Sequence, residues 1–150
     1  MGNIFSQSIA EVKISYSHKV KPSEQKRINS STEVYKLLAP IWADIDYVET
    51  FAVVLLSRAN KIIGIKVVSV GGVAGTEVDP KVVFQAALKA SASSLILIHN
   101  HPSGELRASE QDISITKKIK AGGKVLDIAV LDHIILTSER YLSFADEGIL

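Results

Sequence analysis

The chain contains the stretch LILIHNHPSGELRASEQD at residues 95–112. Residues 95–98 are predicted to form a short buried strand, and His99 and His101 follow it directly. On an extended backbone residues i and i+2 face the same side, about 6.6–6.8 Å apart, so two imidazoles in this pattern can converge on one metal ion. A bare His-x-His is more often two solvated or hydrogen-bonded histidines, so the rest of the motif has to separate the two interpretations.

The second part of the motif is Ser109 followed by Asp112. Seven residues separate Ser109 from the second histidine, which is enough for the intervening loop to turn back. Ser109 is predicted to cap the next helix, placing Asp112 in its first turn, and the two could simply be a capping pair stabilised by the helix dipole. Both roles can coexist. Catalytic zinc sites use three protein ligands and leave a fourth position for water, and His99, His101 and Asp112 would make such a trio.

The flanking sequence alternates between strands and helices. Apolar runs of strand length predict strands, and N-cap residues predict the starts of helices. Strands are predicted over residues 12–16, 51–56, 62–70, 95–98, 126–131 and 134–137, and helices are predicted to begin after Ser30, Asp79 and Ser109. Pro40 should end or bend the first helix, and Gly122 with Gly123 should terminate the third. These elements predict an α/β (α+β) protein with a mixed β-sheet and helices packed on it.

Composition excludes several classes of protein. A chain of 150 residues fits one domain, and 47% hydrophobic with 22% charged residues is typical of a globular protein rather than a disordered one. No run of about 18 apolar residues is present, so no membrane partner is expected. The formal net charge of +1 gives no electrostatic signature for a polyanion. Cysteine is absent, so any metal site must use nitrogen and oxygen ligands.

The first residues of the chain bear on its location. Residues 1–6 lack the positively charged end followed by a long apolar stretch that an export signal requires. We therefore expect a cytoplasmic protein. No motif specifies an oligomeric state.

The segment HNHPSG at residues 99–104, together with Ser109 and Asp112, resembles the JAMM (MPN-plus) metalloprotease motif, and the bacterial RadC family in particular. Further segments are also similar to that family: residues 49–56, 79–84, 132–135 and 143–148. The resemblance implies a RadC-like JAMM/MPN-plus domain over residues 45–150, with residues 1–44 as a strand-and-helix lead-in to the same domain. It also implies the three-layer JAMM/MPN fold, which is similar to that of the cytidine deaminases.

The same resemblance implies a role for five side chains. His99, His101 and Asp112 match the ligands of a zinc ion. Glu49 matches the upstream glutamate that accepts a proton from the zinc-activated water, and Ser109 matches a hydrogen-bond donor to the tetrahedral intermediate. The implied activity is zinc-dependent hydrolysis of a peptide or isopeptide amide.

Other polar residues near the motif have competing interpretations. Glu77 is the alternative proton acceptor. Asp132 and His133 are interpreted as hydrogen-bonding partners behind the ligands, with a surface position or direct metal binding as alternatives. Asn100 is expected to point to the opposite face of the sheet and to fix the loop rather than touch substrate.

Two alternative functions stay open. The RadC name is attached to DNA repair, and the basic cluster Lys117, Lys118, Lys120 and Lys124 could contact nucleic-acid phosphates, although such a cluster is more often an exposed helix face. The other alternative is a scaffold with a non-catalytic zinc site. Hydrolytic deamination is disfavoured because zinc deaminases use a Cys-x-x-Cys pair.

Overall fold

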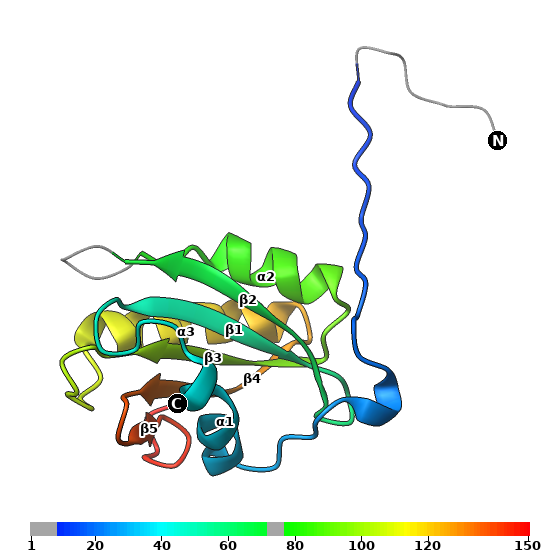
Figure 1. Ribbon diagram of the computed structural model, residues 1–150. Helices are drawn as coiled ribbons and strands as arrows, with labels where there is room; N and C mark the ends of the chain where they lie inside the picture. The colour runs from blue at the N-terminus through cyan, green and yellow to red at the C-terminus, as the bar shows by residue number, and fades with distance from the viewer. Residues whose placement is uncertain (1–8, 72–76) are drawn as a thin grey trace.

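Five strands form one mixed sheet in the part of the chain that the computed structural model describes, residues 9–71 and 77–150 (Figure 1). The strands are β1 (Thr50–Leu56), β2 (Ile62–Val70), β3 (Ser94–Asn100), β4 (Ala129–Leu136) and β5 (Tyr141–Ser143). Their order is β2-β1-β3-β4-β5. β3 pairs antiparallel with β1 and parallel with β4. The strand that leads into the histidine motif therefore lies in the middle of the sheet.

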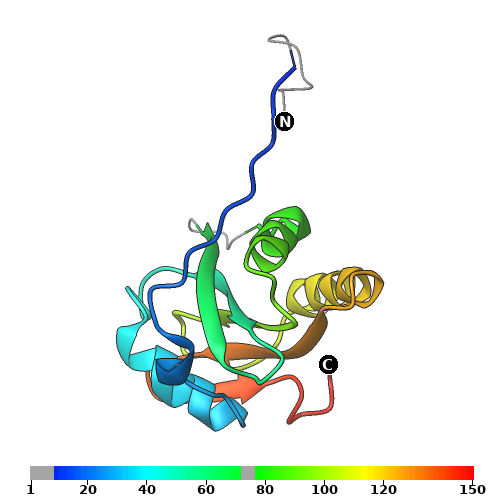
Figure 2. The same ribbon diagram turned by 90° about the vertical axis from the view of Figure 1, so that its right-hand side faces the viewer.

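Helices cover both faces of this sheet (Figure 2). α2 (Pro80–Lys89) and α3 (Glu110–Val125) pack on one face, where Val83, Ala87 and Ile119 are buried against β1 and β3. α1 (Ser31–Leu38) packs on the other face through Val34 and Leu38. Every residue of β3 is buried, which explains why the strand is a continuous apolar run rather than an alternating one. The predicted α/β architecture of three layers is confirmed.

The helix starts are set by local capping chemistry, as predicted. The side chains of Ser30, Asp79 and Ser109 each accept a hydrogen bond from a backbone N–H of the first turn. α1 ends at Leu38, and a 3-10 turn over Ala39–Ile41 that contains Pro40 follows it. These boundaries could be predicted because the residues that define them are close in sequence.

The predicted end of α3 at Gly122 and Gly123 is wrong, because the helix continues to Val125. A Cβ atom at Gly123 would lie 2.3 Å from the carbonyl oxygen of Ile128, and one at Gly122 would lie 2.8 Å from the ring of Phe84. The glycine pair therefore serves close packing of the helix against α2 and against the returning chain. It does not serve as a cap.

The two strands predicted over residues 126–131 and 134–137 are one strand, β4. The pairing with β3 shifts at Leu131, where a bulge leaves one extra residue, and then continues through Asp132 and His133. The carboxylate of Asp132 accepts hydrogen bonds from the Ser143 hydroxyl at 2.5 Å and from the Ala145 N–H at 2.9 Å. A polar pair can lie inside this strand because its groups are bonded to distant parts of the chain.

The strand predicted over residues 12–16 is also wrong. These residues lie in an extended arm that leaves the body of the molecule and pairs with no strand of the described chain (Figure 1). Residues 1–6, on which the expectation of a cytoplasmic location rests, lie outside the described residues. Among residues 9–71 and 77–150, no helix has the length and apolar character to cross a bilayer.

Candidate metal centre

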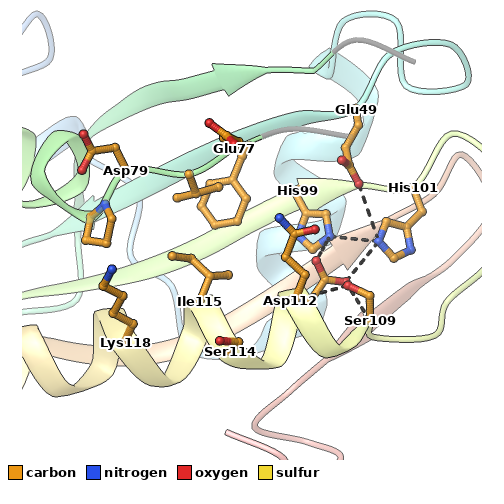
Figure 3. A pocket seen from close by; sticks show the side chains of 14 residues that line it. Glu49, Glu77, Asp79, His99, His101, Ser109, Asp112, Ser114, Ile115 and Lys118 are labelled. Atoms are coloured by element: carbon orange, nitrogen blue, oxygen red, sulfur yellow. Dashed lines mark hydrogen bonds and ion pairs between the residues drawn. The ribbon is translucent and has the colours of Figure 1, made fainter. Parts of the chain in front are cut away.

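The two histidines of the motif converge at the end of β3 (Figure 3). Their Nε2 atoms lie 2.9 Å apart. The His99 side chain is 1% exposed, whereas that of His101 is 15% exposed. Phe51 stacks on His99 with ring centroids 5.6 Å apart and so shields that ring on one side. One imidazole is therefore held inside the protein, and the other lies at the surface of the site.

Asp112 faces both imidazoles from the first turn of α3. Its Oδ1 atom lies 3.4 Å from Nε2 of His99, and its Oδ2 atom lies 3.4 Å from Nε2 of His101. Oδ2 also accepts a hydrogen bond from the backbone N–H of Ser109 at 2.9 Å, while the Ser109 hydroxyl accepts one from the N–H of Asp112 at 3.0 Å. The same carboxylate thus belongs both to the capping box of α3 and to the histidine cluster.

Glu49 approaches from the opposite side, just before β1. Its Oε1 atom lies 3.8 Å from Nε2 of His101. One potential ligand atom from each of Glu49, His99 and His101 lies within 4.8 Å of the other two. Glu77, the alternative candidate, is exposed and lines the same groove, but it is not part of this group. The carboxylate of Glu49 therefore lies close enough to contact a ligand bound between His99 and His101.

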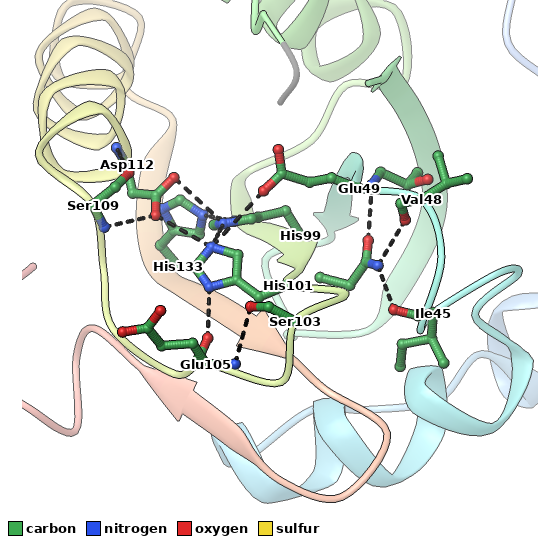
Figure 4. A network of polar contacts seen from close by, with 12 residues as sticks. Ile45, Val48, Glu49, His99, His101, Ser103, Glu105, Ser109, Asp112 and His133 are labelled. Atoms are coloured by element: carbon green, nitrogen blue, oxygen red, sulfur yellow. Dashed lines mark hydrogen bonds and ion pairs between the residues drawn. The ribbon is translucent and has the colours of Figure 1, made fainter. Parts of the chain in front are cut away.

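A chain of buried hydrogen bonds behind His99 sets its tautomer. The Thr116 hydroxyl donates to the carbonyl oxygen of Asp112 at 2.6 Å, so its single hydrogen is used and it must accept from Nδ1 of His133, also 2.6 Å away. The remaining nitrogen of His133, Nε2, then accepts from Nδ1 of His99 at 2.7 Å (Figure 4). His99 consequently carries its hydrogen on Nδ1 and presents the lone pair of Nε2 to the cluster.

His101 is oriented in the same way by the backbone. Its Nδ1 atom lies 2.7 Å from the carbonyl oxygen of Glu105, which can only accept a hydrogen bond (Figure 4). Two Nε2 lone pairs therefore face each other across 2.9 Å, with carboxylate oxygens beside them. When both rings are neutral, neither nitrogen has a hydrogen for the other, and only a proton or a cation between them satisfies both. This donor set fits a metal ion.

The pKa directions agree with that arrangement. Burial alone would raise the pKa of Asp112, but hydrogen bonds with His101 and His99 hold it far below its usual value. Burial alone would lower the pKa of His101, but the contacts with Asp112, the Glu105 carbonyl and Glu49 raise it above 6.5. Burial, and then the neighbouring His99, lower the pKa of His133, so that ring is neutral.

Asn100 points to the opposite face of the sheet, as predicted, but the loop that it holds is the one before β1. Its side-chain oxygen accepts from Trp42 Nε1 at 2.9 Å and from the Thr50 N–H at 2.8 Å. Its amide donates to the carbonyls of Ile45 and Val48, both at 2.8 Å. The fully buried Asn100 therefore fixes the backbone on both sides of Glu49.

A groove of about 830 Å³ extends from the cluster between α3 and the start of α2 (Figure 3). Ile115 and Lys118 line it from α3, and Val78 and Asp79 line it from the opposite side. Lys118 thus faces this groove, whereas a second groove at the other side of α3 is lined by Lys117, Lys120 and Lys124. The four lysines of the predicted basic cluster are divided between two surfaces.

Two contributors to the site were not predicted from the sequence. Thr116 lies four residues after Asp112 on α3, a spacing that puts both on one helix face and so could have been a signal. The carbonyl of Glu105 carries no signal in its residue type, because any residue at that position offers the same backbone oxygen.

Comparison with known proteins gives consistent matches. A family model described as a RadC-like JAB domain matches residues 28–149. A UPF0758 protein of Flavobacterium johnsoniae is 48% identical over 124 residues, which cover 83% of this chain and 54% of the relative. UPF0758 proteins of Methanococcoides burtonii and Desulfitobacterium hafniense are 40% and 39% identical over 126 and 123 residues, covering 84% and 82% of this chain and 55% and 54% of theirs. The chain thus spans about half the length of these curated relatives.

Proposed function

This chain belongs to the family of RadC-like JAB domains, and from that premise we propose that it is a zinc-dependent hydrolase of peptide or isopeptide amides. The observation that carries the proposal is the pair of Nε2 lone pairs, 2.9 Å apart, with an Asp112 oxygen 3.4 Å from each. Two imidazoles and one carboxylate are a ligand set that catalytic zinc sites use, with a fourth position left for water.

His99, His101 and Asp112 would hold the ion. A bound zinc ion supplies Lewis acidity, which lowers the pKa of a water molecule and polarises an amide carbonyl. Phe51 stacks on His99 and shields one side of its ring from solvent. The hydrogen bonds through His133 and Thr116 place the hydrogen of His99 on Nδ1, so the lone pair of Nε2 faces the proposed metal ion. Of the alternatives for His133, the position behind a ligand is thus the one that the hydrogen bonds support.

Glu49 is proposed as the proton carrier. Its carboxylate is 23% exposed and lies 3.8 Å from His101, so it can contact both the centre and a molecule in the groove. It would take up a proton at Oε1 and deliver it to the leaving nitrogen of the amide. Asn100 would keep this carboxylate in place through its bonds to the backbone around it.

Ser109 is proposed to stabilise the oxygen that gains negative charge. The Ser109 hydroxyl oxygen accepts the Asp112 N–H, and this leaves its own hydrogen free to donate. The side chain is exposed and lines the groove beside both histidines. A single such donor is worth about 10²–10³ in rate where it has been removed from comparable sites.

Metal analysis of the full chain, purified without a histidine tag, tests the proposed ligands. We expect about one zinc ion per chain in the wild type and none in His101→Ala. Asp112→Asn should lose zinc, whereas Glu49→Gln should keep it and lose hydrolysis of a library of isopeptide-linked peptides followed by mass spectrometry. Loss of zinc in Glu49→Gln to the same extent as in Asp112→Asn would make Glu49 a ligand. Absence of zinc from the wild type would overturn the metal centre.

A further inference from the structure

The outer edge of β2 is open. β2 is the first strand in the sheet order, and no strand pairs with its outer side between Gly64 and Val68 in the described chain. Ile65 and Val67 are 51% and 50% exposed beside this edge. An edge strand with free backbone groups and exposed β-branched side chains is a template for an added strand.

The arm over residues 9–18 has the complementary pattern. Val12, Ile14 and Tyr16 alternate with Glu11, Lys13 and Ser15, so the apolar side chains share one side of the extended backbone. Val12 is 85% exposed and Ile14 is 76% exposed. An extended segment of this kind gains stability only when it pairs with another strand.

The start of β2 already binds the chain that follows the arm. The N–H of Ile62 donates to the carbonyl of Lys26 at 2.8 Å, next to an antiparallel bridge between Arg27 and Lys61. The Tyr16 hydroxyl donates to the carbonyl of Ile63. Ser15 and Tyr16 line a groove with Gly64, Ile65 and Lys66 of the same chain. Before these residues the arm runs away from the body in both views (Figures 1 and 2), and no strand is added to the edge of its own β2.

We propose that two copies of this chain exchange their arms, with residues 10–16 of each copy added as a sixth strand to the outer edge of β2 of the other. Seven extended residues span about 23 Å, which is enough to follow the open edge from Gly64 to Val68. The exchange is reciprocal, so one two-fold axis closes it and covers both edges. The proposal rests on the arm and β2 alone and does not depend on the metal centre.

Disulfide cross-linking tests the exchange directly, because the natural chain has no cysteine. A chain carrying Ile14→Cys is mixed with a differently tagged chain carrying Val67→Cys, and a second mixture uses Ile65→Cys. Under mild oxidation we expect a covalent heterodimer in at least one mixture. Lys124→Cys, on the exposed end of α3, serves as the matched control and should give no heterodimer with Ile14→Cys.

Measurement of the molecular mass in solution by light scattering provides a second, independent test. We expect about twice the chain mass of 16.2 kDa for the wild type. Ile14→Asp should shift the mass to that of a monomer, whereas Lys13→Asp, on the other side of the arm, should leave the dimer intact. A wild-type monomer at every concentration would overturn the proposal. So would a dimer that survives Ile14→Asp, or a disulfide that forms only within a single chain carrying both cysteines.

Discussion

Nδ1 of His99 lies 2.7 Å from Nε2 of His133, and both rings are buried. Burial lowers the pKa of His133, so its ring is neutral, and its Nδ1 atom donates a hydrogen bond to the Thr116 hydroxyl. Its Nε2 atom must therefore accept the hydrogen bond from Nδ1 of His99. The ring of His133, which lies behind the candidate metal centre, therefore decides which nitrogen of His99 faces that centre. Such supporting bonds are as much part of a metal site as the ligands are.

Thr116→Val should weaken zinc binding by about 10–100-fold, because it removes the group that fixes His133 and, through it, the tautomer of His99. Competition with a fluorescent chelator measures the affinity. Long-range ¹H–¹⁵N spectra of the metal-free protein should show His99 protonated on Nδ1 in the wild type and a mixture of tautomers in the variant. Thr116→Ser keeps the hydroxyl and should behave like the wild type. Equal affinities for the valine and serine variants would contradict the relay.

His101 should stabilise the metal-free fold at low pH and lose that effect as the pH rises. Its folded-state pKa is raised above 6.5, so its contribution is fully present below 6.5 and disappears as the pH passes the raised value. The difference in unfolding free energy between wild type and His101→Gln, measured in urea with a chelator present, should therefore be larger near pH ~6 than near pH ~9. When both proteins also carry Asp112→Asn, this difference in unfolding free energy should change less with pH. An unchanged pH dependence would mean that a group other than Asp112 stabilises protonated His101.

Asn100→Ala should lower the free energy of unfolding by about 3 kcal/mol, because four hydrogen bonds are lost at a buried position and each is worth about 0.5–1.5 kcal/mol. Trp42→Phe removes one of the four bonds and serves as the graded control, with a loss of about 1 kcal/mol from that bond. Limited proteolysis should cut residues 42–49 faster in Asn100→Ala, while zinc content stays unchanged. Proteolysis at the wild-type rate would mean that other contacts hold this loop.

Gly123→Ala should destabilise the fold by about 1–3 kcal/mol, as overpacking of a close contact does. The added Cβ would lie 2.3 Å from the carbonyl oxygen of Ile128, a backbone atom that cannot move aside cheaply. Gly64→Ala is the control, because a Cβ there would meet no atom within 4 Å. Chemical denaturation measures the free energy of unfolding of the two variants. An equal loss of stability in Gly123→Ala and Gly64→Ala would contradict the prediction.

The elements that could be predicted from sequence are those defined by near neighbours. Ser30, Asp79 and Ser109 cap helices through bonds to residues two or three positions away. The apolar run of β3 likewise predicts a strand buried on both faces, and the histidines after it converge because alternate residues share a face. The histidine cluster was therefore foreseeable from spacing.

The elements that were mispredicted depend on contacts between distant residues. Gly122 packs inside α3 where a Cβ would meet the ring of Phe84 from α2, and the carboxylate of Asp132 inside β4 is bonded to Ser143 and Ala145. The strand predicted over residues 12–16 has the correct alternation but no partner strand among residues 9–71 and 77–150. Glu49 is fifty residues from His99 in sequence, and its position beside the cluster follows from the pairing of β1 with β3.

The central place of β3 sets an order of assembly for the site. A strand with neighbours on both sides and helices above and below is among the last parts of a protein to open, whereas a first helical turn and a loop fray early. His99 lies within β3 and is 1% exposed, whereas His101 follows the strand and is 15% exposed. We therefore expect transient opening to release Asp112, Glu49 and His101 before His99, so that His99 is the last member of the cluster to lose its place.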